Sequence, residues 1–292
     1  MTAATVQPTF SAWWKKHGDA YDGILFDIDG TLISGRHPLP GAASLIAHLR
    51  SAGFPFLLLT NDGNHSPEEK SRTLARAGLD LGPADIVSCG HALTPHAARH
   101  GLAGQRFYAM GDLGVPDYAA IAGLVPVREP REIGGCAGVI VGEGVYNWQD
   151  NIGAALNFFI GHPDRPLLVP NPDSYWPNGP NGEIGIGAGG KARFLCQILR
   201  DYGIRKSPVY LGKPYPAIFR LACCRLHERA PHHGRMHPKR ILMIGDSLAS
   251  DIRGANRAGL DSALVLTGIT TPTHLRAAKA ACSPRWVFRA LN

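Results

Sequence analysis

Five side chains with acidic, hydroxyl or ammonium groups stand just after short apolar runs of this chain: Asp27, Asp29, Thr60, Lys213 and Asp246. Short apolar runs bounded by turn residues predict buried strands. The carboxyl ends of parallel strands meet at one edge of an open sheet, which is where such sheets bind ligands. We therefore expect these five side chains to lie in one crevice, although the segments that carry them are far apart in the sequence.

The chemistry of that crevice follows from the residue types. Three carboxylates, Asp27, Asp29 and Asp246, would repel one another unless a hard divalent cation lay among them, and Mg²⁺ prefers oxygen ligands. Lys213 can neutralise a carboxylate and a transferring phosphoryl group, and Thr60 offers a hydroxyl donor. A carboxylate beside a metal and a lysine has the parts needed for nucleophilic phosphoryl transfer. Each fragment alone fits an ordinary turn or helix cap, but the ordered combination favours function.

The apolar runs alternate with segments of helical character, which predicts βαβ units and an α/β fold. The architecture expected is a Rossmann-like, doubly wound parallel sheet. Strands are expected at 23–27, 54–60, 209–212, 240–246 and 262–268. Helices are expected at 42–52, 66–78, 216–226 and 247–259.

The long separation between Thr60 and Lys213 predicts an inserted domain. The middle of the chain is richer in Gly, Pro and Asn, and it is long enough for about 100 residues with their own core. The expected division is a core domain of residues 1–85 and 189–292, with residues 1–22 as a leader, and an α/β cap domain of residues 86–188. Within the cap, strands are expected at 107–111, 137–142 and 166–171 and a helix at 148–161.

Composition narrows the class of protein. The 292 residues carry a formal charge of +7, but the basic residues are scattered, which argues against nucleic-acid binding. No apolar run approaches a membrane span and no secretory signal is evident, so we expect a cytoplasmic protein. The six cysteines lack a disulfide framework, in keeping with a reducing compartment. Trp13 and Trp14 could anchor the leader to a membrane surface, but packing of a leader helix on the domain is favoured.

The motifs as a set resemble the haloacid dehalogenase superfamily of phosphohydrolases. FDIDGTL is similar to its first motif, LLLTND to its second, GKP to its third and GDSLASD to its fourth. The resemblance implies that Asp27 is the nucleophile that forms an aspartyl-phosphate. It implies that Asp29 protonates the leaving oxygen and later activates water, and that Thr60 and Lys213 hold the phosphate.

The resemblance also implies the cofactor and its ligands. Mg²⁺ would lie on the Asp27 carboxylate, the backbone carbonyl of Asp29 and Asp246, with Asp251 supporting the site from behind. An insertion after the second motif, and the stretch VPNPDSYWP at 169–177, are similar to the NagD-like branch, subfamily IIA, with a type C2 cap. This implies a magnesium-dependent phosphatase for sugar, nucleotide or similar small phosphomonoesters.

Substrate contacts beyond Thr60 and Lys213 are expected from two further segments. Asn61 and Asp62 follow Thr60, and the family usually carries a second Asn where this chain has Asp62, which adds a negative charge near an anionic substrate. Asn171, Asp173 and Tyr175 follow an expected cap strand and could contact the leaving alcohol; the alternative is a structural turn.

Two other functions remain open from the sequence. One is a phosphotransferase or mutase that uses the same aspartyl-phosphate. The other is a non-enzymatic phosphate-receiving regulatory domain, against which the acid/base Asp29 and the large cap argue. The expected partner is a small-molecule phosphomonoester, with no nucleic acid and no membrane; a homodimer is one possible assembly, and the sequence does not determine the oligomeric state.

Overall fold

The computed structural model describes residues 6–177, 183–230 and 236–292. The chain divides into two compact units, which are described separately. The first unit comprises Met1–Thr60, Pro67–Val87 and Lys213–Asn292, and the second comprises Asn61–Ser66 and Ser88–Gly212. The parallel sheets and their helices confirm the expected α/β class.

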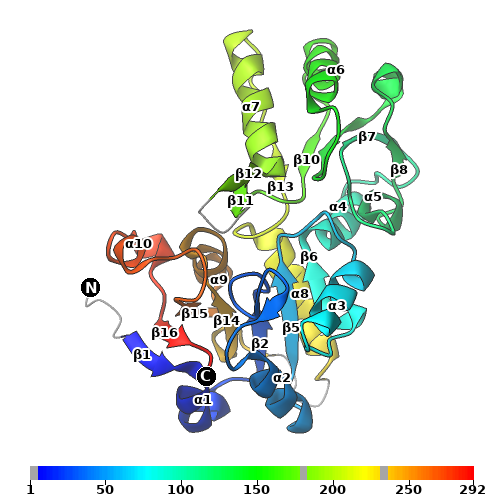
Figure 1. The fold of residues 1–292 in the computed structure, drawn as a ribbon. Coiled ribbons are helices and arrows are strands. Elements are labelled where there is room, and N and C mark those ends of the chain that lie inside the picture. Colours follow the sequence, from blue (N-terminus) through cyan, green and yellow to red (C-terminus); the bar gives the residue numbers. More distant parts are fainter. Residues whose placement is uncertain (1–5, 178–182, 231–235) are drawn as a thin grey trace. The chain divides into compact units, whose positions relative to one another are not determined.

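The first unit is built on one large sheet. Among the described residues it has seven strands in the order β1-β16-β15-β14-β2-β5-β6 (Figure 1). The pairs from β1–β16 through to β2–β5 are parallel. The strands are β1 Val6–Thr9, β2 Gly23–Phe26, β5 Phe56–Thr60, β6 Ile86–Ser88, β14 Ile241–Gly245, β15 Asp261–Val265 and β16 Trp286–Ala290. A small hairpin of β3 Ile33–Ser34 and β4 His37–Pro38 follows β2.

Helices cover both faces of this sheet. The helices of the unit are α1 Phe10–His17, α2 Ala42–Ser51, α3 Pro67–Arg76, α8 Pro216–Glu228, α9 Arg253–Ala258 and α10 Pro272–Arg276. Alternate residues of each strand point to opposite faces. One face, with Ile24, Leu58 and Ile244, packs in a single apolar cluster with α1, α2 and α3. The expected helices at 42–52, 66–78 and 216–226 therefore form close to where the sequence places them.

The N-terminal segment is part of the core. Helix α1 is capped by the hydroxyl of Thr9, and Trp13 and Trp14 are only 6% and 7% exposed. Their rings contact Phe10. The ring of Phe10 packs edge-on against Phe288 of β16, with the two ring centroids 5.4 Å apart. The prediction that the leader packs its two Trp residues on the domain is confirmed. No helix in the described ranges is long and apolar enough to cross a membrane.

The second unit has its own sheet and its own apolar core. Its five described strands run in the order β13-β10-β9-β7-β8, and all four neighbouring pairs are parallel. The strands are β7 Arg106–Met110, β8 Val125–Val127, β9 Gly138–Val141, β10 Leu167–Val169 and β13 Val209–Tyr210, with a hairpin of β11 Tyr175–Pro177 and β12 Ile184–Ile186. The helices are α4 Leu93–Arg99, α5 Tyr118–Ile121, α6 Trp148–Gly161 and α7 Ala188–Asp201.

Two segments differ in place from the sequence-based expectation. Strand β13, expected as a core strand at 209–212, pairs with β10 of the second unit. The expected end of the cap domain at residue 188 would assign helix α7 to the core domain. Leu195 and Leu199 of α7 instead pack in the same apolar cluster as Val139 and Leu167 of the second unit. The reason is that an apolar run in the sequence predicts that a segment is buried but does not predict which sheet it joins. The sequence also predicts a polar surface loop at residues 227–239; its first two residues instead end α8, and residues 231–235 lie outside the described ranges.

We predict that Phe10→Ala destabilises the protein. The ring is fully buried, so its loss leaves a cavity against two Trp residues and Phe288, and such truncations cost about 3–5 kcal/mol. Urea unfolding should show this loss in the free energy of unfolding, whereas the exposed Lys15→Ala on the same helix should change it little. Equal stability of Phe10→Ala and wild type would contradict the packing of the leader.

Candidate active site

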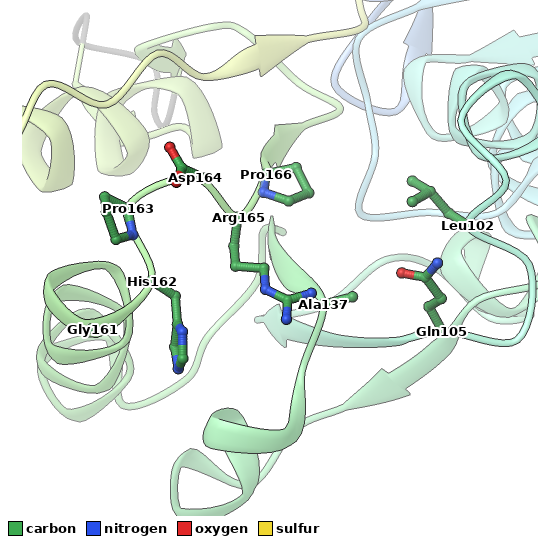
Figure 2. Close-up of a pocket in the computed structure, with 9 residues that line it drawn as sticks. All are labelled: Leu102, Gln105, Ala137, Gly161, His162, Pro163, Asp164, Arg165 and Pro166. Carbon is green, nitrogen blue, oxygen red and sulfur yellow. The ribbon is translucent and has the colours of Figure 1, made fainter.

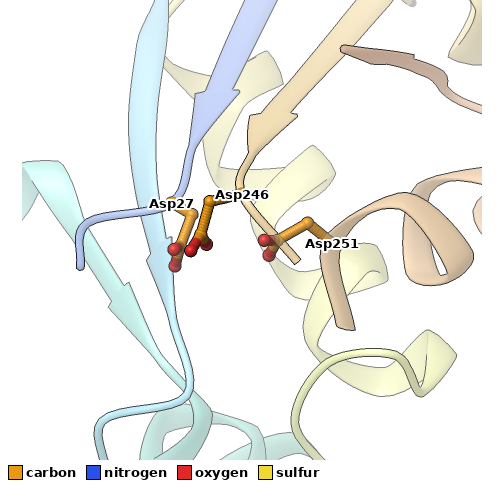
Figure 3. Close-up of side chains that lie close together, drawn as sticks. All are labelled: Asp27, Asp246 and Asp251. Carbon is orange, nitrogen blue, oxygen red and sulfur yellow. The ribbon is translucent and has the colours of Figure 1, made fainter. Parts of the chain in front are cut away.

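Three buried carboxylates meet at the carboxyl edge of the first sheet (Figure 3). Asp27 follows β2, Asp246 follows β14, and Asp251 lies in the π-helical turn Leu248–Ile252. Each offers a carboxylate oxygen, and the three oxygens lie within 4.8 Å of one another. The exposed fractions are 8%, 3% and 0%. Because β2 and β14 are neighbours in the sheet, residues more than 200 positions apart are brought together.

Two glycines make room for Asp246. A Cβ on Gly268 would come within 1.8 Å of its Oδ2, and one on Gly30 within 2.4 Å. Gly30 also has a φ of +81°, which L side chains rarely adopt. The backbone N–H of Ile269 donates to Asp246 Oδ2 at 2.7 Å. The Asp246 carboxylate therefore lies between two loops, and each loop can approach it this closely only because it carries a glycine there.

Lys213 is buried among these acids. Its Nζ donates to Asp27 Oδ1 at 2.6 Å and to Asp251 Oδ1 at 2.7 Å. The other oxygen of Asp251 accepts from the backbone N–H of Ser247 at 3.0 Å. Both oxygens of Asp251 thus have donors, so this residue is suited to orienting the lysine. Asp27 Oδ2 and Asp246 Oδ1 have no donor within the described part of the chain, which leaves them open to a cation.

The electrostatics of the cluster favour such a cation. Burial raises the pKa of Asp27 from 3.8 to about 7, with repulsion from Asp251 adding to the shift and the Lys213 ammonium opposing it. Burial, with repulsion from Asp27 and Asp251, raises the pKa of Asp246 well above its usual range. Burial alone would lower the pKa of Lys213, but Asp251 and Asp27 together raise it. One lysine does not offset three buried carboxylates, and the donor set fits Mg²⁺.

Asp29 and Thr60 differ in exposure. Thr60 ends β5 and is buried, at 4% exposed. The Asp29 side chain is 57% exposed and its Oδ2 accepts from Lys70 Nζ at 2.9 Å. Lys70 is not among the site residues predicted from the sequence. Its signal was a lysine at an inner position of an amphipathic helix, where an apolar residue is usual.

The predicted substrate residues of the second unit form a hydrogen-bonded network of their own. Asn61 Nδ2 donates to Asp173 Oδ2 at 3.0 Å, and the N–H of Asp173 donates to Asn171 Oδ1 at 2.8 Å. Asn171 Nδ2 donates to Glu143 Oε1 at 2.6 Å. Glu143 is not among the site residues predicted from the sequence, although it lies just beyond the apolar strand β9, much as Asp27 follows β2. Tyr175 is 56% exposed at the start of β11.

The side chain of Asp62 stabilises the turn in which it lies. Its Oδ1 accepts from the backbone N–H groups of Asn64 at 3.0 Å and His65 at 3.2 Å, and the His65 ring lies 3.0 Å from Oδ2. This is the local side-chain-to-backbone bonding typical of Asp in turns. The extra acid in the second motif therefore has a structural task.

A surface pocket of about 370 Å³ lies in the second unit (Figure 2). Its lining includes Gln105, Ala137 and Pro166, which immediately precede β7, β9 and β10. The pocket is thus at the amino ends of these strands, the edge opposite to Glu143 and Asn171. It contains none of the predicted site residues.

Comparison with known proteins places this geometry in a family. A model of haloacid dehalogenase-like hydrolases matches residues 24–125, and a second model, HAD-hydrolase-like, matches residues 210–292. The two regions contain Asp27, Thr60, Lys213 and Asp246. The chain belongs to the haloacid dehalogenase-like hydrolases. Within that family it stands in the NagD-like branch, as its similarity to individual members shows.

The chain is 31% identical over 264 residues to D-glycerol 3-phosphate phosphatase of Mycobacterium tuberculosis, spanning 88% of this chain but 66% of that relative. It is 28% identical to the ribonucleotide monophosphatase NagD of Escherichia coli, over 85% of this chain and 88% of the relative. The crystal structure of the M. tuberculosis glycerol phosphate phosphatase in complex with magnesium superposes with a TM-score of 0.77 at 27% identity, covering 93% and 75% of the two chains. These matches confirm the Rossmann-like fold expected for the family.

The raised pKa of Asp27 predicts a pH-dependent stability cost. Without metal, folded Asp27 keeps its proton up to about pH 7, whereas the unfolded chain loses it near 3.8. The folded state therefore binds more protons in this window, and its stability falls as pH rises through it. At pH 8 in EDTA, Asp27→Asn should melt several degrees above wild type, since 1 kcal/mol shifts Tm by about 2–4 °C.

At pH 4 the Tm values of wild type and Asp27→Asn should be nearly equal, because both proteins are then uncharged at position 27. Mg²⁺ at pH 8 should raise the Tm of wild type more than that of the variant. Asp80→Asn, an exposed aspartate of the same unit, is the matched control and should show neither effect. A Tm difference between Asp27→Asn and wild type that is independent of pH and metal would contradict the assignment.

Proposed function

We propose that this protein is a magnesium-dependent phosphatase that hydrolyses small phosphomonoesters through an aspartyl-phosphate on Asp27. The observation that carries the proposal is the contact of Lys213 with both Asp27 and Asp251, beside Asp246, at the carboxyl edge of the sheet. A purely structural sheet has no use for buried like charges at this position. Membership of the haloacid dehalogenase-like hydrolases supports the same chemistry.

Asp27 is the proposed nucleophile. Lys213 donates to its Oδ1 and fixes the orientation of the carboxylate, one oxygen of which attacks phosphorus. The new bond between the carboxylate oxygen and phosphorus forms as the bond from phosphorus to the ester oxygen breaks, and the alcohol leaves. Water then attacks the aspartyl-phosphate and restores the carboxylate, releasing inorganic phosphate.

Lys213 and Thr60 are the proposed phosphate-binding residues. The buried ammonium stays protonated because Asp251 and Asp27 raise its pKa. It can therefore supply a fixed positive charge to the oxygens of the transferring group. Thr60, buried at the end of β5 in the same unit, supplies a hydroxyl.

Asp29 is the proposed acid and base. Its exposed side chain stands two residues beyond the nucleophile, outside the buried cluster. It gives a proton to the leaving oxygen and takes one from the attacking water, so the proton balance closes over one turnover.

Asp27 and Asp246 would hold the Mg²⁺ with the backbone carbonyl of Asp29, and Asp251 orients Lys213 behind them. When bound, the ion offsets the charge of the carboxylates and of the phosphate. That relief lets Asp27 stay ionised at neutral pH, as a nucleophile must.

The proposed substrates are phosphate esters of sugars, nucleotides or similar metabolites, in the cytoplasm, with neither nucleic acid nor a membrane as partner. The curated relatives include phosphatases named for glycerol 3-phosphate, ribonucleotides, dihydroxyacetone and sugars. The cysteines are all free thiols, which suits a reducing compartment.

The loop from Asn171 to Tyr175 is proposed to select among these esters. Asp173 is bonded to Asn61, the residue that follows Thr60 in the chain, and Gly212, which precedes Lys213, donates its N–H to Pro170. The loop is thus hydrogen-bonded to the chain neighbours of both proposed phosphate-binding residues. Asp173 can bond a hydroxyl and Tyr175 can pack on a sugar or base. The core of the first unit recognises only the phosphate and cannot tell one ester from another.

We predict that Asp27→Asn abolishes turnover while the protein remains folded. The amide cannot attack phosphorus, and loss of a nucleophile costs several orders of magnitude in rate. Phosphate release from 4-nitrophenyl phosphate with Mg²⁺ measures it, and Asp80→Asn serves as a control of equal chemistry. Activity of Asp27→Asn within tenfold of wild type would rule out the covalent route.

We predict that Asp173→Ala and Tyr175→Ala alter kcat/KM unequally across a panel of phosphate esters. The esters with hydroxyls or bases should change by about tenfold or more, and 4-nitrophenyl phosphate should change little. Tyr202→Ala, at another largely exposed tyrosine of the same unit, is the matched control. A uniform fall across the panel would mean that the loop only supports the fold.

A further inference from the structure

Helix α3 carries a lysine on its inner face. The buried residues of this helix are Pro67, Lys70 and Leu74, which lie on one stripe at the spacing expected for a packed face. Lys70 is 8% exposed, and its neighbours along the stripe are apolar. The position is one that an amphipathic helix normally fills with an apolar side chain.

Local energetics make a lysine unfavourable there. The first turn of a helix is its positive end, where Glu68 and Glu69 are the expected residues. Burying an ammonium also costs free energy unless a counter-charge compensates. Departures of this kind from local preference are found mainly at functional sites.

Asp29 supplies a counter-charge. Lys70 Nζ donates to Asp29 Oδ2 at 2.9 Å, and the lysine side chain is 10% exposed against 57% for the aspartate. The lysine is thus anchored by packing, and the aspartate reaches towards it as the exposed residue of a largely buried loop. An exposed ion pair would contribute little, but here one partner is fixed by the helix.

The backbone around Asp29 is fixed, and its side chain is held separately. Leu32 donates its N–H to the carbonyl of Ile28 at 2.8 Å, and Gly30 donates to Ile33 at 2.7 Å, which closes a tight loop. These bonds set where the Asp29 Cα lies but not its rotamer. The contact with Lys70 adds that restraint.

We propose that Lys70 is a positioning residue that holds Oδ2 of Asp29, so that Oδ1 faces the leaving oxygen. The inference rests on the proposed function, in which Asp29 is the acid. The proton leaves Oδ1 for the ester oxygen as the P–O bond breaks and the Asp27–phosphorus bond forms. An ordered acid needs less reorganisation to reach this geometry, which is the benefit of a fixed catalytic group.

A positioning role for Lys70 makes the effect of its loss depend on the leaving group, whereas a purely structural role would affect all esters alike. An alkoxide is a poor leaving group and needs the proton, whereas 4-nitrophenolate leaves without it. The ratio kcat/KM reports steps up to departure of the alcohol. Loss of Lys70 should therefore lower kcat/KM for alkyl phosphates and spare that for 4-nitrophenyl phosphate.

The experiment compares Lys70→Met, Lys70→Arg and Arg72→Met. Methionine keeps the packed chain and removes the charge, arginine keeps a cationic donor, and Arg72 is an exposed cation on the same helix that serves as the matched control. For the best alkyl ester of the panel, Lys70→Met should lose at least tenfold more kcat/KM than for 4-nitrophenyl phosphate. Lys70→Arg should recover part of that difference and Arg72→Met should show none.

Equal losses on both ester types, or no loss, would overturn the inference. Should Lys70→Met fail to fold, Lys70→Gln makes the same comparison. The Mg²⁺-induced rise in Tm should match wild type in the Lys70 variants, and its loss would also count against a positioning role. Failure of the proposed function is separate, because wild type would then hydrolyse neither ester or Asp27→Asn would remain active.

Discussion

The bridge from Lys213 to Asp27 and Asp251 is the interaction on which the rest of the site depends. Three carboxylates within 4.8 Å of one another would push the ends of β2 and β14 and the turn after β14 apart. A single buried ammonium, held by two of them, keeps these segments together. It leaves the cluster with excess negative charge, so the fold retains an affinity for a cation and, through it, for an anionic substrate.

The surrounding backbone is shaped to this bridge. Glycines at 30 and 268 give Asp246 space that no other residue would leave, and the π-helical turn places Asp251 where Lys213 and the N–H of Ser247 meet it. Such turns are rare and occur mainly at functional sites. The free energy that these features cost is supplied by the apolar packing of the large sheet, to which the N-terminal helix adds its aromatic cluster.

The second unit repeats the principle with different groups. Glu143, Asn171 and Asp173 follow or face strand ends and form a chain of hydrogen bonds that reaches Asn61. Burial raises the pKa of Glu143, and the bonds from Asn171 and from the N–H of Ala188 oppose that shift. Asp62 differs from these residues, because its carboxylate accepts hydrogen bonds from the backbone of its own turn.

The sequence by itself determined the α/β class, the strand-end placing of Asp27, Thr60 and Asp246, and the existence of an insertion, because these depend on local hydrophobic patterns and on motif order. Tertiary structure decided which sheet takes β13 and α7, since an apolar segment does not encode its partner. It also decided the partners of single side chains: Lys70 with Asp29, and Glu143 with Asn171. Such contacts join residues distant in sequence, and no local pattern records the distance between two side chains.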